Sequence, residues 1–87
     1  MKIYVKNELY GKGSARLAKM LVRDYKAVFN NGAYCFETIE TIDELNKLVR
    51  RMIETLGEVN IYPFITPFKE SLMITLRQIN RDTMCFK

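Results

Sequence analysis

The segment from Thr41 to Gly57 constrains the fold more than any other, because it carries a helix start, a helix stop and an apolar face. Thr41-Ile42-Asp43-Glu44 is a capping box, whose hydroxyl and carboxylate can satisfy backbone donors at a helix start. Gly57 favours the left-handed conformation that ends helices. At ~100° per residue, the apolar side chains between them form a stripe about 140° wide. Its members are Ile42, Leu45, Leu48, Val49, Met52, Ile53 and Leu56. The pattern predicts a helix that ends at Leu56 and buries one side.

A second amphipathic segment precedes it, from Ser14 to about Phe29. Ser14 offers an N-cap hydroxyl. The apolar side chains fall within an arc of about 140°, and the basic ones within about 80° on the opposite side. The apolar positions are Leu17, Ala18, Leu21, Val22, Tyr25, Val28 and Phe29, and the basic ones are Arg16, Lys19, Arg23 and Lys26. A β-hairpin through Asn31-Gly32 is the competing interpretation. The helical period fits better, so we expect a helix that ends at Asn30-Asn31-Gly32.

Two short segments flank this helix and alternate as strands do. Residues 2–6 alternate polar and apolar side chains and direct Ile3 and Val5 toward the core. Residues 33–39 also alternate, but the sequence does not decide which of their faces is buried.

The last two alternating segments predict a hairpin. Residues 58–66 and 71–79 are joined by Thr66-Pro67-Phe68-Lys69, which is typical of a turn. Pro63 has no N–H for a strand ladder, so the first segment is expected to be an edge strand or to contain a bulge.

The resulting order of elements is β-α-β-α-β-β. It packs most simply as a two-layer α/β sandwich, with two helices on one face of a mixed four-stranded sheet. With 87 residues the chain has room for one core, so we expect a single α/β domain at 1–79 and a tail at 80–87. The second face of the sheet would stay open to solvent, to a partner or to a second copy in a homodimer. The side chains expected there are Lys2, Tyr4, Lys6, Tyr62, Thr75 and Arg77.

The absence of histidine excludes much of familiar enzymology. It rules out nucleophiles activated by imidazole and His-ligated zinc sites. Cys35 and Cys85 lie fifty positions apart with no C-x-x-C pair, so we expect free thiols rather than a metal site or a redox loop. An acid/base pair among Glu37, Glu40, Asp43 and Glu44 is not expected, because helix capping accounts for Asp43 and Glu44 and so small a fold offers little cleft to desolvate a carboxylate. We therefore expect a protein that is not an enzyme and has no cofactor.

We expect neither a signal peptide nor a membrane span from this sequence. Lys6 and Glu8 interrupt any apolar region of a signal peptide, and no apolar run approaches the ~20 residues of a membrane span. These features predict a cytoplasmic protein with no membrane partner.

Charge is distributed unevenly along a chain whose net charge is +4. Residues 1–27 hold seven basic and two acidic side chains, whereas residues 28–46 hold four acidic and none basic. On the second helix, Asp43 can pair with Lys47, and Glu54 with Arg50 and Arg51, at helical spacing.

The basic face of the first helix has no such partners. Its one nearby acid, Asp24, falls outside the basic sector, and Arg16 lies in the first turn, where the helix dipole disfavours a cation. We expect Arg16, Lys19, Arg23 and Lys26 to contact the phosphates of DNA or RNA as positioning groups. A solvated face and an acidic protein surface are the alternatives.

A candidate anion-binding loop leads into the same helix. Gly11-Lys12-Gly13-Ser14 places two glycines, a lysine and a hydroxyl at a helix N-terminus, where backbone N–H groups can hold a phosphate. It matches neither the P-loop nor the dinucleotide-binding fingerprint. The alternative is a capped turn with flexible glycines.

Aromatic side chains recur on the predicted strands. They are Tyr4, Tyr34, Phe36, Tyr62 and Phe64. They could form a base-stacking sheet, as in proteins that bind single strands. Core packing is the alternative for at least half of them.

Two resemblances add further alternatives. The order of elements and the segment Glu8-Leu9-Tyr10-Gly11-Lys12-Gly13 resemble the C-terminal half of GNAT acetyltransferases. In that family a Q/R-x-x-G-x-G/A turn holds the pyrophosphate of acetyl-CoA. This chain departs from the pattern in two ways, because Glu8 replaces the leading Gln or Arg and the first three strands of the family have no counterpart. In size and in its Lys-, Ile-, Asn- and Tyr-rich composition, the chain is similar to small bacteriophage proteins, including anti-CRISPR inhibitors. The resemblance to GNAT acetyltransferases implies an acyl-CoA-binding fold. The similarity to small bacteriophage proteins implies a stoichiometric inhibitor or adaptor.

We expect a small non-enzymatic protein that docks its basic helix face onto nucleic acid or a nucleoprotein complex. An inhibitor that binds an acidic protein surface is the first alternative. A minimal acyl-CoA-binding fold is the second.

Overall fold

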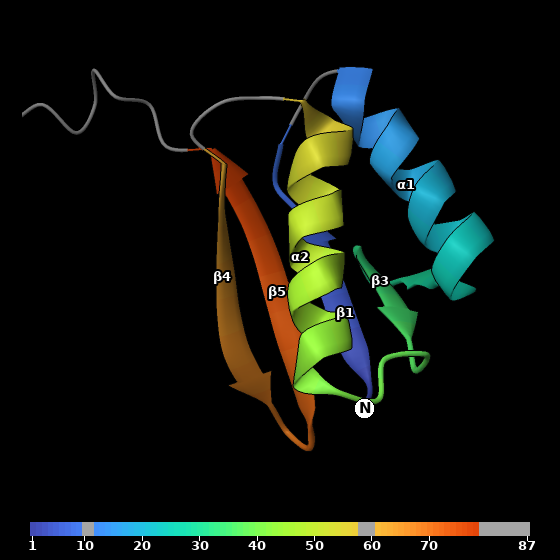
Figure 1. Cartoon of the computed structure of the whole chain (residues 1–87), viewed down its shortest axis with the longest axis vertical. Coiled ribbons are helices and arrows are strands. Elements are labelled where there is room, and N and C mark those ends of the chain that lie inside the picture. Colours follow the sequence, from blue (N-terminus) through green and yellow to red (C-terminus); the bar gives the residue numbers. More distant parts are fainter. Residues whose placement is uncertain (10–11, 58–60, 79–87) are drawn as a thin grey trace, which may run out of the picture.

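The computed structural model describes residues 1–9, 12–57 and 61–78, which form two helices and one mixed five-stranded sheet. The elements are β1 (Ile3–Asn7), α1 (Lys12–Tyr25), β2 (Val28–Asn30), β3 (Ala33–Phe36), α2 (Ile42–Leu56), β4 (Ile61–Phe68) and β5 (Ser71–Gln78). The sheet order is β2-β3-β1-β5-β4. β1 is parallel to β5, and the other neighbours are antiparallel. Both helices cover the same face of the sheet (Figure 1). The chain therefore has the expected α/β architecture with one strand more than the sequence predicts.

The additional strand, β2, corrects the prediction of one helix up to Phe29. α1 ends at Tyr25, and residues 28–30 instead pair with β3. Asn31 and Gly32 take left-handed φ angles of 52° and 81°, as a tight hairpin turn between twisted strands requires. The competing hairpin interpretation is thus right for residues 28–36. Val28 and Phe29, expected on the buried face of a helix, are 65% and 61% exposed.

α2 forms as its end signals predict. The Thr41 hydroxyl accepts a hydrogen bond from the Glu44 N–H at 3.1 Å, as predicted. The Glu44 carboxylate, expected to accept from a backbone N–H, accepts from that hydroxyl instead, at 3.3 Å. Gly57 ends the helix with a φ of 65°, and its N–H donates to the Ile53 carbonyl at 3.2 Å. The buried residues of the stripe are Leu45, Leu48, Met52 and Leu56. Ile42 is the exception to the predicted stripe, because it is exposed.

The core lies between the two helices and the centre of the sheet. Ile3 and Val5 of β1 are fully buried, as predicted, beside Ile74 of β5. The helices contribute apolar side chains that are equally buried, among them Leu17 and Leu48. This layer fixes which side of the sheet the helices cover.

The opposite face of the sheet is open, as predicted. The register aligns Tyr4 with Met73 and Lys6 with Thr75 on the side that the helices do not cover. Tyr62 and Arg77 continue this face on β4 and β5. Cys35, a free thiol, lies opposite Tyr4 in the strand register and is half-buried on this face.

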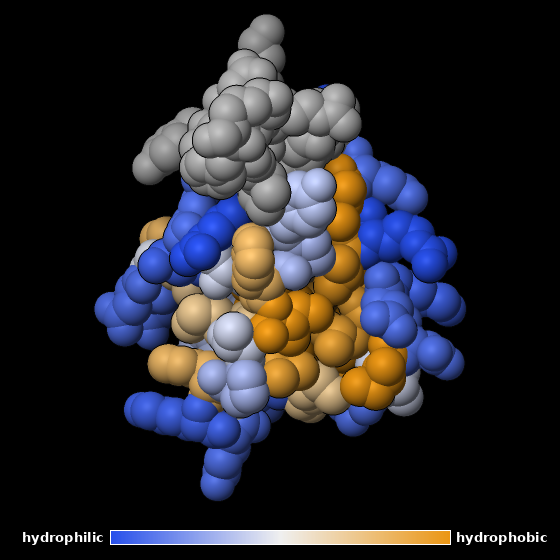
Figure 2. Space-filling model, turned by 90° about the vertical axis from the view of Figure 1, so that its left-hand side faces the viewer, coloured by the Kyte–Doolittle hydropathy of each residue, from blue (hydrophilic) through white to orange (hydrophobic). Residues whose placement is uncertain are grey.

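β4 is an edge strand, as Pro63 predicts. It runs on to Phe68, so the hairpin turn lies at Lys69 and Glu70 rather than at residues 66–69. Figure 2 faces the side of the molecule where β4 lies and shows apolar surface at its centre with hydrophilic residues around it. Ile65 of β4 is 45% exposed on the helix-facing side of the sheet, because the helix layer does not extend over this edge.

Several predictions lie outside the described residues. They concern Gly11, residues 58–60, Ile79, Cys85 and the tail at 80–87. The boundary between a domain at 1–79 and a tail stays a prediction.

α1 and α2 approach each other most closely at Gly13. A Cβ atom at this position would lie 2.4 Å from the Leu56 carbonyl oxygen and 3.0 Å from the Leu56 Cα. Backbone atoms cannot yield as a flexible side chain can, so only glycine allows this approach. Gly13 is buried, and it joins the start of α1 to the end of α2.

We predict that Gly13→Ala destabilises the protein by about 1 to 3 kcal/mol, because the added methyl group overpacks the helix contact. In a helix without this contact, the same change would stabilise by up to about 1 kcal/mol. Urea unfolding followed by circular dichroism measures the difference. Gly32→Asn is the control, because asparagine tolerates a positive φ and the space around Gly32 is open. A stabilising Gly13→Ala would contradict the close contact.

Candidate nucleic-acid interface

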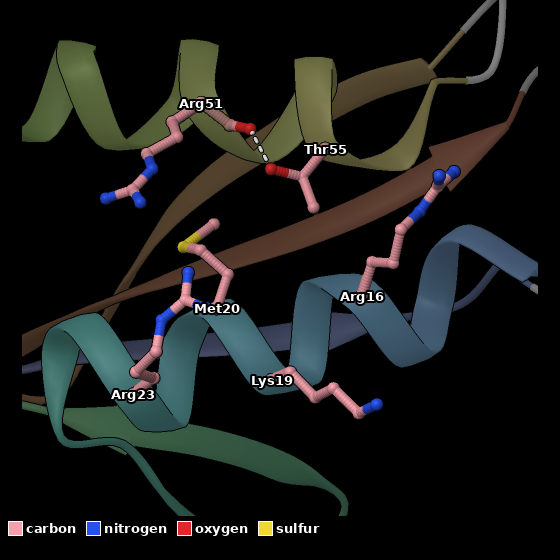
Figure 3. A pocket seen from close by; sticks show the side chains of 6 residues that line it. All are labelled: Arg16, Lys19, Met20, Arg23, Arg51 and Thr55. Atoms are coloured by element: carbon pink, nitrogen blue, oxygen red, sulfur yellow. Dashed lines mark hydrogen bonds between the residues drawn. The ribbon is translucent and has the colours of Figure 1, made fainter.

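A groove between α1 and α2 collects basic side chains from both helices. Its cavity measures about 290 Å³. Its lining includes Arg16, Lys19, Met20 and Arg23 of α1, and Arg51 and Thr55 of α2 (Figure 3). The structure thus brings three of the four predicted α1 cations together and adds Arg51.

Helical spacing explains how the groove is built. Arg16, Lys19 and Arg23 are separated by three and four residues, so they follow one side of α1. Met20 is buried beneath them and forms an apolar base. From α2, the Thr55 hydroxyl donates to the Arg51 carbonyl at 2.7 Å, one turn back along the helix (Figure 3). The site is therefore a rim of cations over an apolar floor.

Asp24 links the two helices beside this groove. It accepts hydrogen bonds from Arg23 Nε at 2.9 Å and from Arg23 Nη2 at 3.3 Å. Its second oxygen, Oδ2, also accepts from Arg51 Nη2. The hydrogen bonds from Arg23 are the largest cause that lowers the pKa of Asp24, and the charge of Arg51 lowers it further. The carboxylate therefore stays charged in mildly acidic solution and partly neutralises both guanidinium groups.

These contacts correct two charge assignments. Asp24 was expected outside the sector of the α1 cations, yet it pairs with Arg23. Arg51 was expected to pair with Glu54 along its own helix, but its ion pair is with Asp24 of α1. The Arg51 guanidinium also lies 5.9 Å from the centre of the Tyr25 ring, and the nearby Tyr25 side chain is the first cause that raises the pKa of Arg51. Contacts between the helices therefore fix Arg51 at the groove.

Arg16 and Lys19 differ from these two arginines. Within residues 1–9, 12–57 and 61–78, neither forms an ion pair. A Cβ atom at Gly57 would lie 3.7 Å from Arg16 Nη2. The Arg16 guanidinium therefore lies at the C-terminal end of α2. The negative end of that helix dipole favours a cation there. α1 begins at Lys12, so Arg16 is in its second turn and not in the unfavourable first turn.

Lys26 is the predicted cation that does not line the groove. It follows the end of α1 with a φ of 59°, and its Nζ donates to the Arg23 carbonyl at 3.4 Å. The prediction of a four-residue helical stripe is wrong at this position, because α1 stops one residue earlier.

The structure assigns packing contacts to part of the glycine-rich segment. Gly13 lies against Leu56, and the Ser14 hydroxyl donates to the Leu9 carbonyl at 3.2 Å. Ser14 lies inside α1, so the prediction that it is the N-cap is wrong. Gly11 lies outside the described residues, and anion binding by Gly11, Lys12, Gly13 and Ser14 stays a prediction.

A shallow hollow on the outer side of α1 adjoins the groove. It measures about 480 Å³, and Ala18 and Val22 lie between Lys19 and Arg23 in its lining. Val22, predicted to face the core, is 50% exposed here. Lys19 and Arg23 therefore border both the groove and an apolar surface.

Comparison of the chain with protein-family models, curated proteins and solved structures gives no match. In the part of the chain that the structure describes, no three His, Cys, Asp or Glu side chains gather where they could hold a metal ion. Neither described helix combines the length and apolarity that crossing a membrane requires. The groove between α1 and α2 is therefore the feature that indicates a function.

We predict that Asp24→Asn tightens the binding of a polyanion such as an oligonucleotide roughly two- to tenfold. The change removes the negative charge that faces Arg23 and Arg51 but keeps the shape of the side chain. Fluorescence anisotropy at constant salt measures the affinity. Asp43→Asn makes the same change of charge on an exposed residue of α2 and should have a smaller effect. Equal effects of the two substitutions would mean that net charge, and not the groove, determines the affinity.

Proposed function

We propose that this chain is a non-enzymatic nucleic-acid-binding protein that docks the groove between α1 and α2 onto phosphates of a nucleic acid or a nucleoprotein complex. The observation that carries this proposal is that Arg16, Lys19, Arg23 and Arg51 all line one cavity. Asp24 is the acid that pairs with two of them in the described part of the chain.

Electrostatics favours an external anion at this site. Cations one turn apart repel each other by a few tenths of a kcal/mol per pair on an exposed helix. Asp24 compensates for the arginines at one end, whereas Arg16 and Lys19 form no ion pair within the described ranges. A phosphate bound here would replace this repulsion by attraction.

The dimensions of the groove suit a phosphate chain. Arg16 and Arg23 are seven residues apart, which corresponds to ~10 Å along a helix. A duplex carries about one charge per 1.7 Å of its axis, so several phosphates fall within that length. Guanidinium groups hold phosphate oxygens through paired hydrogen bonds. We infer that these side chains position the protein on the backbone and do not read bases.

An inhibitor or adaptor that binds an acidic protein is the second candidate. The exposed Val22, between Lys19 and Arg23 in the outer hollow of α1, supports it, because protein interfaces combine an apolar centre with a charged rim. Acyl-CoA binding has less support, since Gly13 and Ser14 pack against Leu56 and Leu9.

We predict that the double substitution Arg16→Glu and Lys19→Glu weakens the binding of labelled DNA or RNA more than tenfold at ~0.1 M salt. It replaces attraction to phosphates by repulsion at the two groove cations that have no ion pair among the described residues. For the unaltered protein, four phosphate contacts predict a log–log salt slope of about −3 to −4. Fluorescence anisotropy across a salt series measures both quantities.

Lys47→Glu with Arg50→Glu is the matched control, because it changes net charge equally on the exposed side of α2. Its loss of affinity should be much smaller than that of the groove variant. Binding that does not depend on salt, or equal losses of affinity in both double variants, would contradict binding of nucleic acid at the groove. If neither DNA nor RNA binds and an acidic protein does, the second candidate replaces the first.

A further inference from the structure

The open face of the sheet carries a second cavity, far from the helix layer. It measures about 290 Å³ and crosses the face from the β2–β3 turn to the β4–β5 turn. Tyr4 and Met73 lie at its middle, Asn30 and Asn31 at one end, and Phe68 and Lys69 at the other. We call this cavity the aromatic trough.

Two rings of the trough offer stacking surface. Tyr4 and Phe68 meet edge to face, with their centres 5.3 Å apart and their planes at 78°. Such a pair uses one ring edge and one ring face, so flat ring surface remains for a third aromatic group. Phe68 keeps 39% of its surface exposed, although burial would stabilise the fold. A flat ligand that covers Phe68 would bury this surface.

Cations border both rings. Lys2 Nζ lies 5.7 Å from the centre of the Tyr4 ring, and Lys69 Nζ lies 5.9 Å from that of Phe68. Neither lysine forms an ion pair with a residue in the described ranges. Further along the same face, Arg77 lies 5.3 Å from the Phe64 ring and pairs with Glu8 at 2.8 Å. The trough thus combines rings with lysines that form no ion pair in the described ranges, which complements an anionic ligand that carries aromatic groups.

The amides at the other end supply hydrogen bonds of both kinds. The side chains of Asn30 and Asn31 each contain two N–H donors and a carbonyl acceptor, which match the edges of a nucleobase. The tight turn holds Asn31 in a left-handed conformation with a φ of 52°.

We propose that the aromatic trough binds an unpaired nucleobase, and that the nucleic acid this protein recognises is therefore single-stranded. The inference depends on the proposed function, in that it takes the ligand to be a nucleic acid. A base in a duplex is stacked on both sides and shows only its edges, whereas a base in a single strand can leave the stack and cover an aromatic ring.

The positions of the two sites support the same ligand. The groove lies between the two helices, and the trough lies on the face of the sheet that the helices leave uncovered. A duplex is stiff over ~150 base pairs and cannot fold around a protein this small without a large bending cost. A single strand can pass around an edge of the sandwich and occupy both sites.

The test compares a labelled mixed-sequence oligonucleotide with its own duplex by fluorescence anisotropy. Phe68→Leu removes the ring but keeps an apolar side chain. It should weaken single-strand binding about 5- to 100-fold, the effect of ~1–3 kcal/mol of stacking, and leave duplex binding unchanged. Phe29→Leu is the matched control, because Phe29 is an exposed ring at the β2 edge that packs on Tyr34 away from the trough. It should change neither affinity.

A second variant keeps the test valid if Phe68→Leu perturbs folding, which circular dichroism detects. Lys69→Glu places an acid in the exposed β4–β5 turn and should lower the affinity for the single strand by at least threefold. If the affinity for the single strand stays unchanged in both variants, the trough does not bind a base. The groove would not be affected by this result, because the Arg16→Glu and Lys19→Glu double variant tests it separately. A sedimentation result in which the protein dimerises through Phe68 would also overturn base binding at the trough, since a second copy would then cover this face. If no oligonucleotide binds at all, the proposed function fails together with the trough.

Discussion

The close contact between Gly13 and Leu56 is the constraint on which the helix layer depends. A side chain at position 13 would meet the backbone of α2, so the absence of one allows the start of α1 to rest against the end of α2. From this contact the two helices diverge along the sheet (Figure 1). Arg16 consequently lies at the C-terminal end of α2, and Arg51 meets Asp24 further along. The groove is the space that this divergence leaves, and its charge follows from the residues at its two margins.

The sequence predicts those parts of the fold whose signals are local and agree with one another. α2 forms between its predicted ends because the Thr41 cap, the Gly57 stop and an apolar stripe all specify the same element. The buried positions of β1 and the edge position of β4 follow from alternation and from Pro63. α1 was predicted too long, because Val28 and Phe29 continue the helical period by chance. The Asn31-Gly32 turn prevails there, since hairpin geometry requires left-handed residues.

The candidate site is harder to predict than the fold, because it depends on contacts between distant residues. Sequence reasoning found three of its cations from their spacing on α1. It missed Arg51, which pairs with an acid 27 positions earlier in the chain, and no rule of local spacing identifies that partner. The available signal was the position of Arg51 and Thr55 one turn apart beside the apolar stripe of α2. The trough was predicted only in part: Tyr4 was named as a stacking residue, whereas Phe68 was assigned to a turn.

If cations of α1 and α2 hold one polyanion together, they should respond together when it binds. Nuclear magnetic resonance of the ¹⁵N-labelled protein, titrated with a short single-stranded oligonucleotide, measures this response. We expect the side-chain Nε–Hε signals of Arg16, Arg23 and Arg51 to shift together and to saturate at one equivalent, while that of Arg50 on the outer side of α2 stays in place. Shifts at Arg50 alone, or groove arginines that do not respond while the oligonucleotide binds, would contradict it.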